Sequence, residues 1–171
     1  MNKIAIVAGS YDPITLGHLW VLRQGLRMFD QIHMLIADNP GKKSMFSPGE
    51  RRGLIRESAT MYLHDVDVAA RVVIDILPSS QMTVTYATHV GASHIIRGIR
   101  NTTDFEYENQ LNLINKTIAP NIETIFILPP RELIEVSSSL VKGLTGLQGW
   151  KEIAKNYVPP PVLQALAEKT K

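Results

Sequence analysis

Residues 4–18 read IAIVAGSYDPITLGH, an apolar run that passes through a glycine-containing turn into a helical pattern. The unbroken small apolar run at residues 4–8 is typical of a strand buried on both faces of a parallel sheet. Gly9 allows the backbone to turn and to approach a ligand closely, and Asp12-Pro13 favours a turn. Apolar side chains then recur at helical spacing over residues 17–29. The sequence predicts a buried strand, a loop that faces a ligand, and a helix.

Strand and helix patterns alternate along the rest of the chain. We expect further strands at residues 32–37, 66–76 (one or two strands), 93–96 and 123–128, and helices from residue 48 and at residues 82–90, 104–117, 137–144 and 161–169. Ser47 is a plausible N-cap, Pro48 suits the first helical position, and Glu50 completes a capping box. The alternation predicts an α/β fold, a doubly wound parallel sheet with crossover helices.

The composition excludes several classes of protein. A chain of 171 residues with 44% apolar residues suits one globular domain. The absence of cysteine excludes disulfides, thiolate zinc sites and cysteine nucleophiles. A formal charge of +2 favours neither a nucleic-acid nor a membrane partner. The N-terminal apolar run is too short for a signal peptide or a membrane span, so we expect a cytoplasmic protein.

Several common site motifs are missing. No Gly-x4-Gly-Lys-Ser/Thr loop occurs, and no Gly-x-Gly-x-x-Gly follows the first strand. The five histidines are scattered without metal-ligand spacing, and no serine lies in a nucleophile-elbow pattern. Ligands of doubly wound folds bind at the carboxyl ends of the strands. The candidate segments are therefore residues 9–18, 38–46, 97–100 and 129–139.

His18 is the strongest candidate in the first segment. It lies in the first turn of a helix, where unpaired N–H groups and the helix dipole favour an anion. A single histidine at such a position is more often a surface or capping residue. Its combination with Gly9, Thr15 and Gly17 at these spacings favours a phosphate-binding role.

Basic residues follow two other strands. Lys42 and Lys43 suit phosphate binding, although most lysine pairs are solvated surface charges. Arg97 and Arg100 could converge on a polyphosphate, with Gly98 allowing close backbone approach. The alternative is that both arginines form ion pairs with the acids of the next helix, which are Asp104, Glu106 and Glu108. The serines at residues 137–139 could cap a helix and also bind outer phosphates.

These motifs resemble a known family. Thr15-x-Gly17-His18 resembles the signature of the HIGH-type nucleotidyltransferase superfamily. Residues 97–108, with Arg97-Gly98-x-Arg100, and residues 137–142 are similar to the bacterial phosphopantetheine adenylyltransferase family. The resemblance extends from the first strand to Lys142.

The resemblance implies an activity and an assembly. The family transfers an adenylyl group from Mg-ATP to 4′-phosphopantetheine, which yields dephospho-coenzyme A and pyrophosphate. It implies a Rossmann-like nucleotidyltransferase fold in a single domain, residues 1–171, with a C-terminal helical tail at about 150–171. It also implies Mg²⁺ that arrives with ATP, and a homohexamer.

The resemblance further implies a role for each matching residue. Catalytic roles fall on His18, Lys42 and Arg97. Acceptor binding falls on Ser10, Lys42, Thr83 and Arg97. ATP binding falls on Ser10, Tyr11, His18, Gly98, Ile99, Arg100, Glu108, Leu133, Ile134, Glu135, Val136, Ser137, Ser138 and Ser139. No side chain is implied as a metal ligand.

The sequence departs from the family pattern at a few places. Ser10-Tyr11 stands where Thr-Phe is usual, and residues 133–135 replace a stretch that often carries an aromatic residue. The region 69–83 is longer than usual, and Thr85 stands where an acid is common. Two alternatives stay open: a related transferase with another acceptor, such as nicotinamide mononucleotide, or a cytidylyltransferase; and a non-catalytic nucleotide sensor. Residues 104–108 and 137–142 fit the pantetheine family better.

Overall fold

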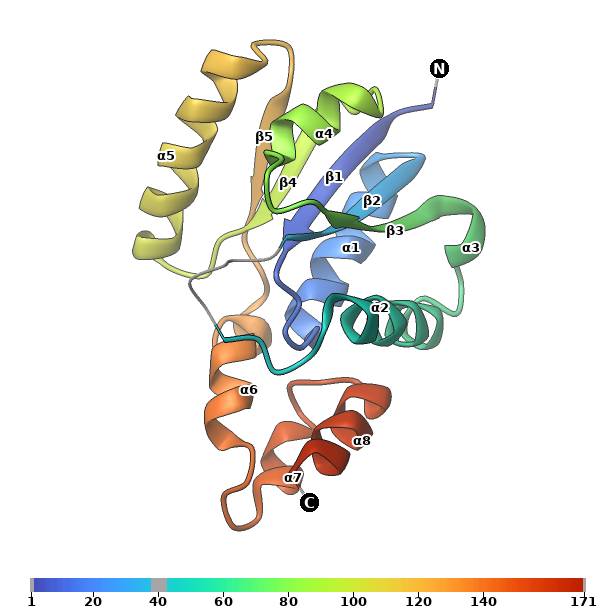
Figure 1. Cartoon of the computed structure of the whole chain (residues 1–171), viewed down its shortest axis with the longest axis vertical. Coiled ribbons are helices and arrows are strands. Elements are labelled where there is room, and N and C mark those ends of the chain that lie inside the picture. The colour runs from blue at the N-terminus through green and yellow to red at the C-terminus, as the bar shows by residue number, and fades with distance from the viewer. Residues whose placement is uncertain (1, 38–42, 171) are drawn as a thin grey trace.

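A five-stranded parallel sheet forms the centre of the computed structural model, which describes residues 2–37 and 43–170 (Figure 1). The strand order is β3-β2-β1-β4-β5. The strands are β1 (Ile4–Gly9), β2 (Gln31–Ala37), β3 (Val72–Leu77), β4 (His94–Gly98) and β5 (Glu123–Ile127). All four strand pairs are parallel. The predicted α/β doubly wound fold is confirmed.

The first strand lies in the middle of this sheet because its side chains are apolar in both directions. Ala5, Ile6 and Val7 are all buried, and β1 pairs with β2 on one side and with β4 on the other. The order of the strands reverses at β1, so its carboxyl end and that of β4 border the crevice in which such folds bind ligands.

Helices cover both faces of the sheet (Figure 1). They are α1 (Leu16–Met28), α2 (Pro48–Tyr62), α3 (Val68–Arg71), α4 (Thr83–His89), α5 (Thr102–Ile118), α6 (Ser138–Leu144), α7 (Trp150–Ala154) and α8 (Pro160–Lys169), with a 3-10 turn, η1, at Arg131–Leu133. The larger core joins α1 and α2 to one face, and a smaller core joins α4 to the other. None of the helices within the described residues is long and apolar enough to cross a membrane.

The capping signals that the sequence shows before residue 48 are confirmed at the start of α2. The Ser47 hydroxyl accepts the Glu50 N–H at 3.3 Å, and the Glu50 carboxylate accepts the Ser47 N–H at 2.6 Å. This is the expected capping box at the start of α2.

The prediction of strand structure over all of residues 66–76 was wrong in its first half. Residues 68–71 form the short helix α3, because Asp67 caps it by accepting the N–H of Ala70 at 3.1 Å. Two alanines inside this turn also favour helix. The turn η1 was not expected, and α7 was expected only as an undivided part of the helical tail at about 150–171.

The three C-terminal helices lie beyond the carboxyl edge of the sheet (Figure 1). Trp150, Val162 and Leu166 belong to the same hydrophobic core as β1 and α1. An ion pair of 2.9 Å also joins Lys169 of α8 to Glu50 of α2. The end of the chain is therefore packed against the sheet domain.

Candidate active site

A pocket of about 270 Å³ opens at the carboxyl ends of β1 and β4. The sequence-predicted residues that line it are Ser10, Tyr11, His18, Arg97, Gly98, Arg100, Glu108, Leu133, Val136, Ser137, Ser138 and Ser139. They come from three of the four candidate segments and from α5. The fold thus brings together residues that lie up to 129 positions apart in the sequence.

Four of the described site residues predicted from the sequence do not line this pocket. Ile99 is buried, Ile134 and Glu135 are exposed to solvent, and Thr83 begins α4. Lys42 lies outside the described residues. Its neighbour Lys43 is described and exposed.

The loop between β1 and α1 forms one wall of the pocket. Tyr11 adopts a left-handed backbone conformation, with φ of +48°, and its hydroxyl donates to the Val7 carbonyl at 2.7 Å. Burial raises the pKa of the Tyr11 phenol well above its usual range, although the charge of Arg97 opposes this. A Cβ atom on Gly9 would lie 3.1 Å from the Tyr11 ring. Glycine at residue 9 therefore leaves room for the Tyr11 ring, which a larger side chain would crowd.

His18 has a fixed tautomer. The Thr15 backbone N–H donates to the imidazole Nδ1 at 3.0 Å, and the Thr15 hydroxyl lies 2.9 Å from the same nitrogen. A nitrogen that accepts an N–H bond carries no proton of its own in the neutral ring, so the proton lies on Nε2. The Tyr11 ring meets the imidazole edge-on, with centroids 5.1 Å apart. His18 therefore presents a positioned N–H donor in the pocket.

Burial and two neighbouring positive charges keep this imidazole neutral. Burial is the largest cause, followed by the charges of Arg100 and Arg97, and together they lower the pKa of His18 to about 4. A neutral imidazole at pH 7 donates a hydrogen bond but does not act as a general acid of ordinary histidine strength.

We expect the His18 ring to stay neutral between pH 8 and pH 5. Its Cε1 proton resonance should hold a constant shift over that range, whereas in the urea-unfolded chain it should titrate near about 6.5. Because the unfolded chain binds this proton more tightly, the free energy of unfolding should fall as pH drops from about 6.5 towards 4. A folded-state midpoint near 6.5 would contradict the assigned environment.

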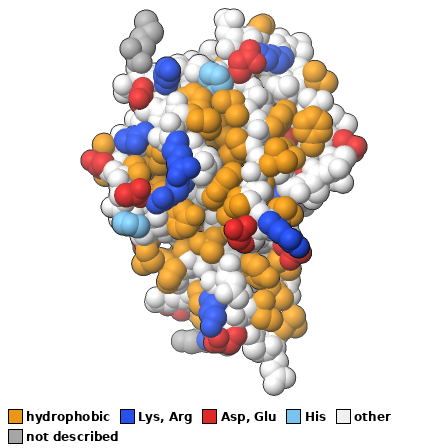
Figure 2. Space-filling view, turned by 180° about the vertical axis from the view of Figure 1, so that it is seen from behind, with side chains coloured by type: hydrophobic (Ala, Val, Ile, Leu, Met, Phe, Trp, Pro, Cys, Tyr) orange, Lys and Arg blue, Asp and Glu red, His pale blue; other side chains and the backbone are white. Residues whose placement is uncertain are grey.

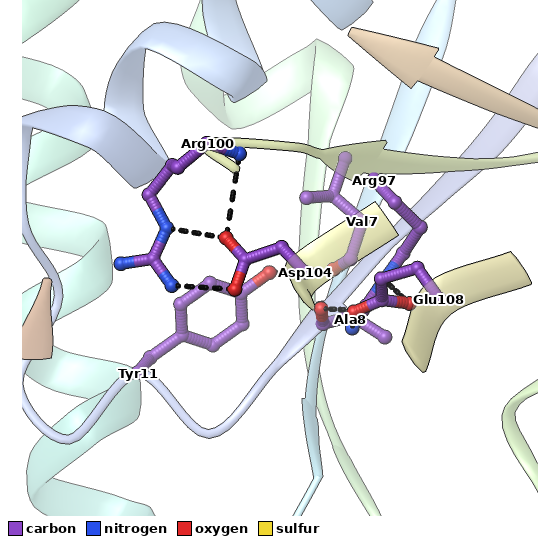
Figure 3. Close-up of polar contacts among 7 residues, drawn as sticks. All are labelled: Val7, Ala8, Tyr11, Arg97, Arg100, Asp104 and Glu108. Carbon is purple, nitrogen blue, oxygen red and sulfur yellow. Dashed lines mark hydrogen bonds and ion pairs between the residues drawn. The ribbon is translucent and has the colours of Figure 1, made fainter. Parts of the chain in front are cut away.

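Two arginines, Arg97 near the end of β4 and Arg100 just after it, are each held by an acid of α5, as Figure 3 shows. Arg97 pairs with Glu108, with an Nε to Oε2 distance of 2.6 Å, and its Nη1 also donates to the Ala8 carbonyl. Arg100 pairs with Asp104, with an Nε to Oδ2 distance of 2.8 Å. The ion-pair alternative is thus correct in this structure for Asp104 and Glu108, while both arginines also line the pocket. The two interpretations are compatible.

The serines before α6 are divided between structure and pocket. The Ser137 hydroxyl accepts the N–H of Leu140 at 3.1 Å, so it is the N-cap of α6 as expected. The Ser138 hydroxyl donates to the Pro13 carbonyl at 2.7 Å and ties this loop to the β1–α1 loop. Ser139 has the most exposed side chain of the three and also lines the pocket.

Sequence reasoning did not identify three residues that support the site: Asp12, Lys142 and Arg51. Asp12 was interpreted only as a turn residue, but it is buried and pairs with Lys142 at 2.8 Å. Arg51, which is also buried, donates from Nη1 to the Ser10 carbonyl at 2.9 Å. Buried charged residues are rare unless they are paired, but no periodicity in the sequence marks them.

Comparison with known proteins decides the family. A family model described as cytidylyltransferase-like matches residues 6–144. The phosphopantetheine adenylyltransferase of Chromobacterium violaceum is 42% identical over 164 residues, which cover 96% of this chain and 95% of that protein. The chain belongs to the phosphopantetheine adenylyltransferase family. The phosphopantetheine adenylyltransferase of Neisseria meningitidis serogroup B is also 42% identical, over 95% of this chain and 91% of its own.

Solved structures show that this member of the phosphopantetheine adenylyltransferase family shares its fold with other adenylyltransferases. The nicotinic acid mononucleotide adenylyltransferase of Plasmodium falciparum, complexed with NaAD, superposes with a TM-score of 0.66 over 98% of this chain and 96% of its own. Its identity is 20%, so the likeness concerns the fold alone. The expected family, fold and class of enzyme, a nucleotidyltransferase, are confirmed.

Proposed function

We propose that this chain transfers the adenylyl group of ATP to 4′-phosphopantetheine, giving dephospho-coenzyme A and pyrophosphate. Membership of the family supports this reaction. The observation that carries it is a neutral His18, with its proton on Nε2, in a pocket that Arg97 and Arg100 also line. Such a set of donors suits the α-phosphate of a nucleotide.

The chemical step requires little proton transfer. An oxygen of the acceptor phosphate attacks the α-phosphorus in line, and the bond from that phosphorus to the oxygen bridging to the β-phosphate breaks. Pyrophosphate leaves with the electron pair. A phosphate monoester with a second pKa of about 6 is already a dianion for the most part at pH 7. Catalysis then consists of positioning and of stabilising negative charge.

His18 and the arginines divide this task. The Nε2–H of His18 donates to a non-bridging oxygen of the α-phosphate, where charge builds up in the transition state. Arg97 and Arg100 contact phosphate oxygens, and Arg97 faces the acceptor. Their pairs with Glu108 and Asp104 keep both guanidinium groups in place before substrate arrives. Preorganised charges cost little reorganisation during the reaction.

The remaining site assignments rest on the family resemblance. We assign the acceptor phosphate to Ser10 and Lys42 and the pantetheine arm to Thr83. ATP contacts the backbone at Ser10-Tyr11, the side chains of the β4–α5 region, and the loop 133–139. The pocket lining supports most of the ATP residues, the exceptions being Ile99, Ile134 and Glu135.

Magnesium enters this reaction as part of the Mg-ATP substrate. Within residues 2–37 and 43–170, no group of three or more His, Asp or Glu side chains is placed to hold a metal ion. The two pocket carboxylates, Asp104 and Glu108, are already paired with arginines. Mg²⁺ is commonly held through substrate phosphates and water rather than by an all-protein cage. This donor set therefore fits a metal carried by the nucleotide.

An acceptor panel tests the substrate. We would measure kcat/KM from pyrophosphate release with Mg-ATP and 4′-phosphopantetheine, with nicotinamide mononucleotide, and with pantetheine that lacks the phosphate. Turnover with phosphopantetheine alone supports the proposal. Preference for nicotinamide mononucleotide would mean that the enzyme catalyses adenylyl transfer but to a different acceptor. Nucleotide binding without any turnover would support a non-catalytic sensor.

We also propose that residues 1–171 form a single nucleotidyltransferase domain that works in the cytoplasm. The C-terminal tail shares the hydrophobic core of the sheet, which supports one domain rather than two. We propose the cytoplasm because the reaction would use cytoplasmic ATP to make a precursor of coenzyme A.

We further propose a homo-oligomer, a hexamer by family resemblance. Helix α5 has no buried residue, and the edge strand β5 beside it is at most partly buried along its length. Exposed large apolar side chains concentrate here: Phe105, Tyr107, Leu113, Ile114, Ile118 and Leu128. Hydrophobic side chains also form a broad band on the face seen in Figure 2. Apolar surface of this extent is typical of an interface.

A charge introduced on α5 should dissociate the oligomer. Leu113 is 61% exposed, so Leu113→Glu costs little in the isolated chain but buries a carboxylate in an interface. We expect sedimentation velocity to show smaller species than the wild type. Met61→Glu on α2, at a side chain 55% exposed, is the matched control. A wild-type monomer at working concentration would contradict the proposed assembly.

A further inference from the structure

Asp12 joins three parts of the chain at one buried carboxylate. It is 3% exposed and accepts the backbone N–H groups of Met45 at 3.0 Å and Phe46 at 2.8 Å. The Lys142 ammonium donates to the same carboxylate at 2.8 Å. The loop between β1 and α1 is thereby tied to the segment before α2 and also to α6.

The carboxylate is held as an anion. Burial works to raise the pKa of Asp12, but the hydrogen bonds from Lys142, Met45 and Phe46 outweigh it and lower the pKa below its usual range. A negative charge buried in this way is stable only while its donors stay in place. Loss of the Lys142 ammonium would leave two backbone N–H groups to satisfy the whole charge.

The two segments that Asp12 joins serve different substrates in the proposed function. Met45 and Phe46 follow Lys42, the acceptor-phosphate residue, by three and four positions. Helix α6 begins directly after Ser137 and carries Ser138 and Ser139 in its first turn, on the ATP side of the pocket. The Ser138 bond to the Pro13 carbonyl is a second tie between α6 and the same loop.

We infer that Asp12 and Lys142 are positioning residues that couple the acceptor-binding segment to the ATP-binding loop. Lys142 itself does not line the described pocket, and neither does Asp12. They act through the segments they hold, so that acceptor phosphate and α-phosphate lie in line. This inference rests on the proposed function for its roles, but the physical coupling can be tested without substrate.

The kinetic test uses Asp12→Asn, Lys142→Met and the double variant. A misplacement of about 1 Å costs up to roughly a hundredfold in rate. We therefore expect each single variant to raise the KM for phosphopantetheine about tenfold and to lower kcat about tenfold. The decisive result is that Lys142→Met, on the ATP side, raises the acceptor KM. The double variant should be no worse than Asp12→Asn alone, because both changes break one unit.

Rescue separates positioning from a merely structural role. Lys142→Arg keeps the cation and should restore the acceptor KM to within about threefold of wild type, since one good donor to Asp12 remains. Lys155→Met removes the cation of the exposed pair with Glu152 and should leave both KM values unchanged. An unchanged acceptor KM in Lys142→Met, with only the melting temperature lowered, would overturn the inference. Fully multiplicative effects of the two variants would also overturn it.

Hydrogen exchange provides a readout that does not depend on the acceptor. In the ligand-free wild type, the amides of Met45 and Phe46 should be protected by Asp12, and Lys142→Met should speed their exchange by about tenfold. If the wild type uses another acceptor, this result still stands and only the proposed function fails. If the wild type uses phosphopantetheine but exchange at these amides is unaffected by Lys142→Met, the coupling fails alone.

Discussion

Replacing His18 with alanine should lower kcat by about 10²–10³-fold while the KM for ATP changes by less than about threefold. The reason is that, in the proposed mechanism, the Nε2–H of His18 interacts most strongly with the charge that develops on the α-phosphate in the transition state. In the proposed function, the arginines and the loop before α6 hold the ground-state nucleotide instead. Steady-state kinetics at saturating phosphopantetheine, with ATP varied, gives both constants.

A matched variant guards against a general effect of losing an imidazole. His64→Ala removes an exposed histidine that is not part of the pocket lining, and it should leave both constants at wild-type values. Turnover by His18→Ala at the wild-type rate would remove His18 from the mechanism. A rise of about 10²–10³-fold in the KM for ATP, without a fall in kcat, would show that His18 only binds the nucleotide.

Replacing Arg97 with methionine should lower kcat/KM for phosphopantetheine by about 10²–10³-fold. The same change leaves the Glu108 carboxylate without its partner. The two side chains are 23% and 12% exposed. We therefore expect a loss of stability of about 1–3 kcal/mol, smaller than for a fully buried pair because water still screens the charges. Chemical denaturation and steady-state kinetics measure the two effects separately.

A second change distinguishes the catalytic role of Arg97 from its ion pair. Glu108→Gln in the Arg97→Met background removes the unpaired charge and should recover most of the lost stability. Turnover should stay low, since no guanidinium is restored to the pocket. If the double variant regains both stability and activity, then Arg97 only neutralises Glu108 and has no part in phosphoryl transfer.

The fold followed from local signals that depend on few residues. The apolar run at residues 4–8 predicts the central strand because only a strand buried on both faces needs such a composition. The capping box at Ser47 and Glu50 predicts the start of α2 to the residue. Helix α3 was missed because its cap, Asp67, stands in a valine-rich stretch whose composition favours a strand.

The candidate site was predictable only where its residues form a compact motif. His18 accepts a hydrogen bond from the Thr15 N–H, and these two residues lie only three positions apart. Their spacing can therefore be recognised in the sequence. Asp12 and Lys142 are 130 positions apart, and their pairing depends on the whole chain folding. The same holds for Arg51 and Ser10, 41 positions apart. Long-range contacts of this kind have no local pattern in the sequence.

The arginine pairs lie between these two cases. The acids at Asp104 and Glu108 are near enough in sequence to Arg97 and Arg100 to suggest pairing, and the structure contains both pairs. The sequence suggested ion pairing and phosphate binding as competing roles. In the structure, Arg97 and Arg100 are each paired with an acid and also line the pocket.

The most direct measurement is to identify the product formed from Mg-ATP and 4′-phosphopantetheine by mass spectrometry, with pyrophosphate counted in the same sample. Our account predicts dephospho-coenzyme A and one pyrophosphate for each acceptor consumed. Release of ADP with phosphate, or pyrophosphate formed without any adenylylated phosphopantetheine, would contradict it.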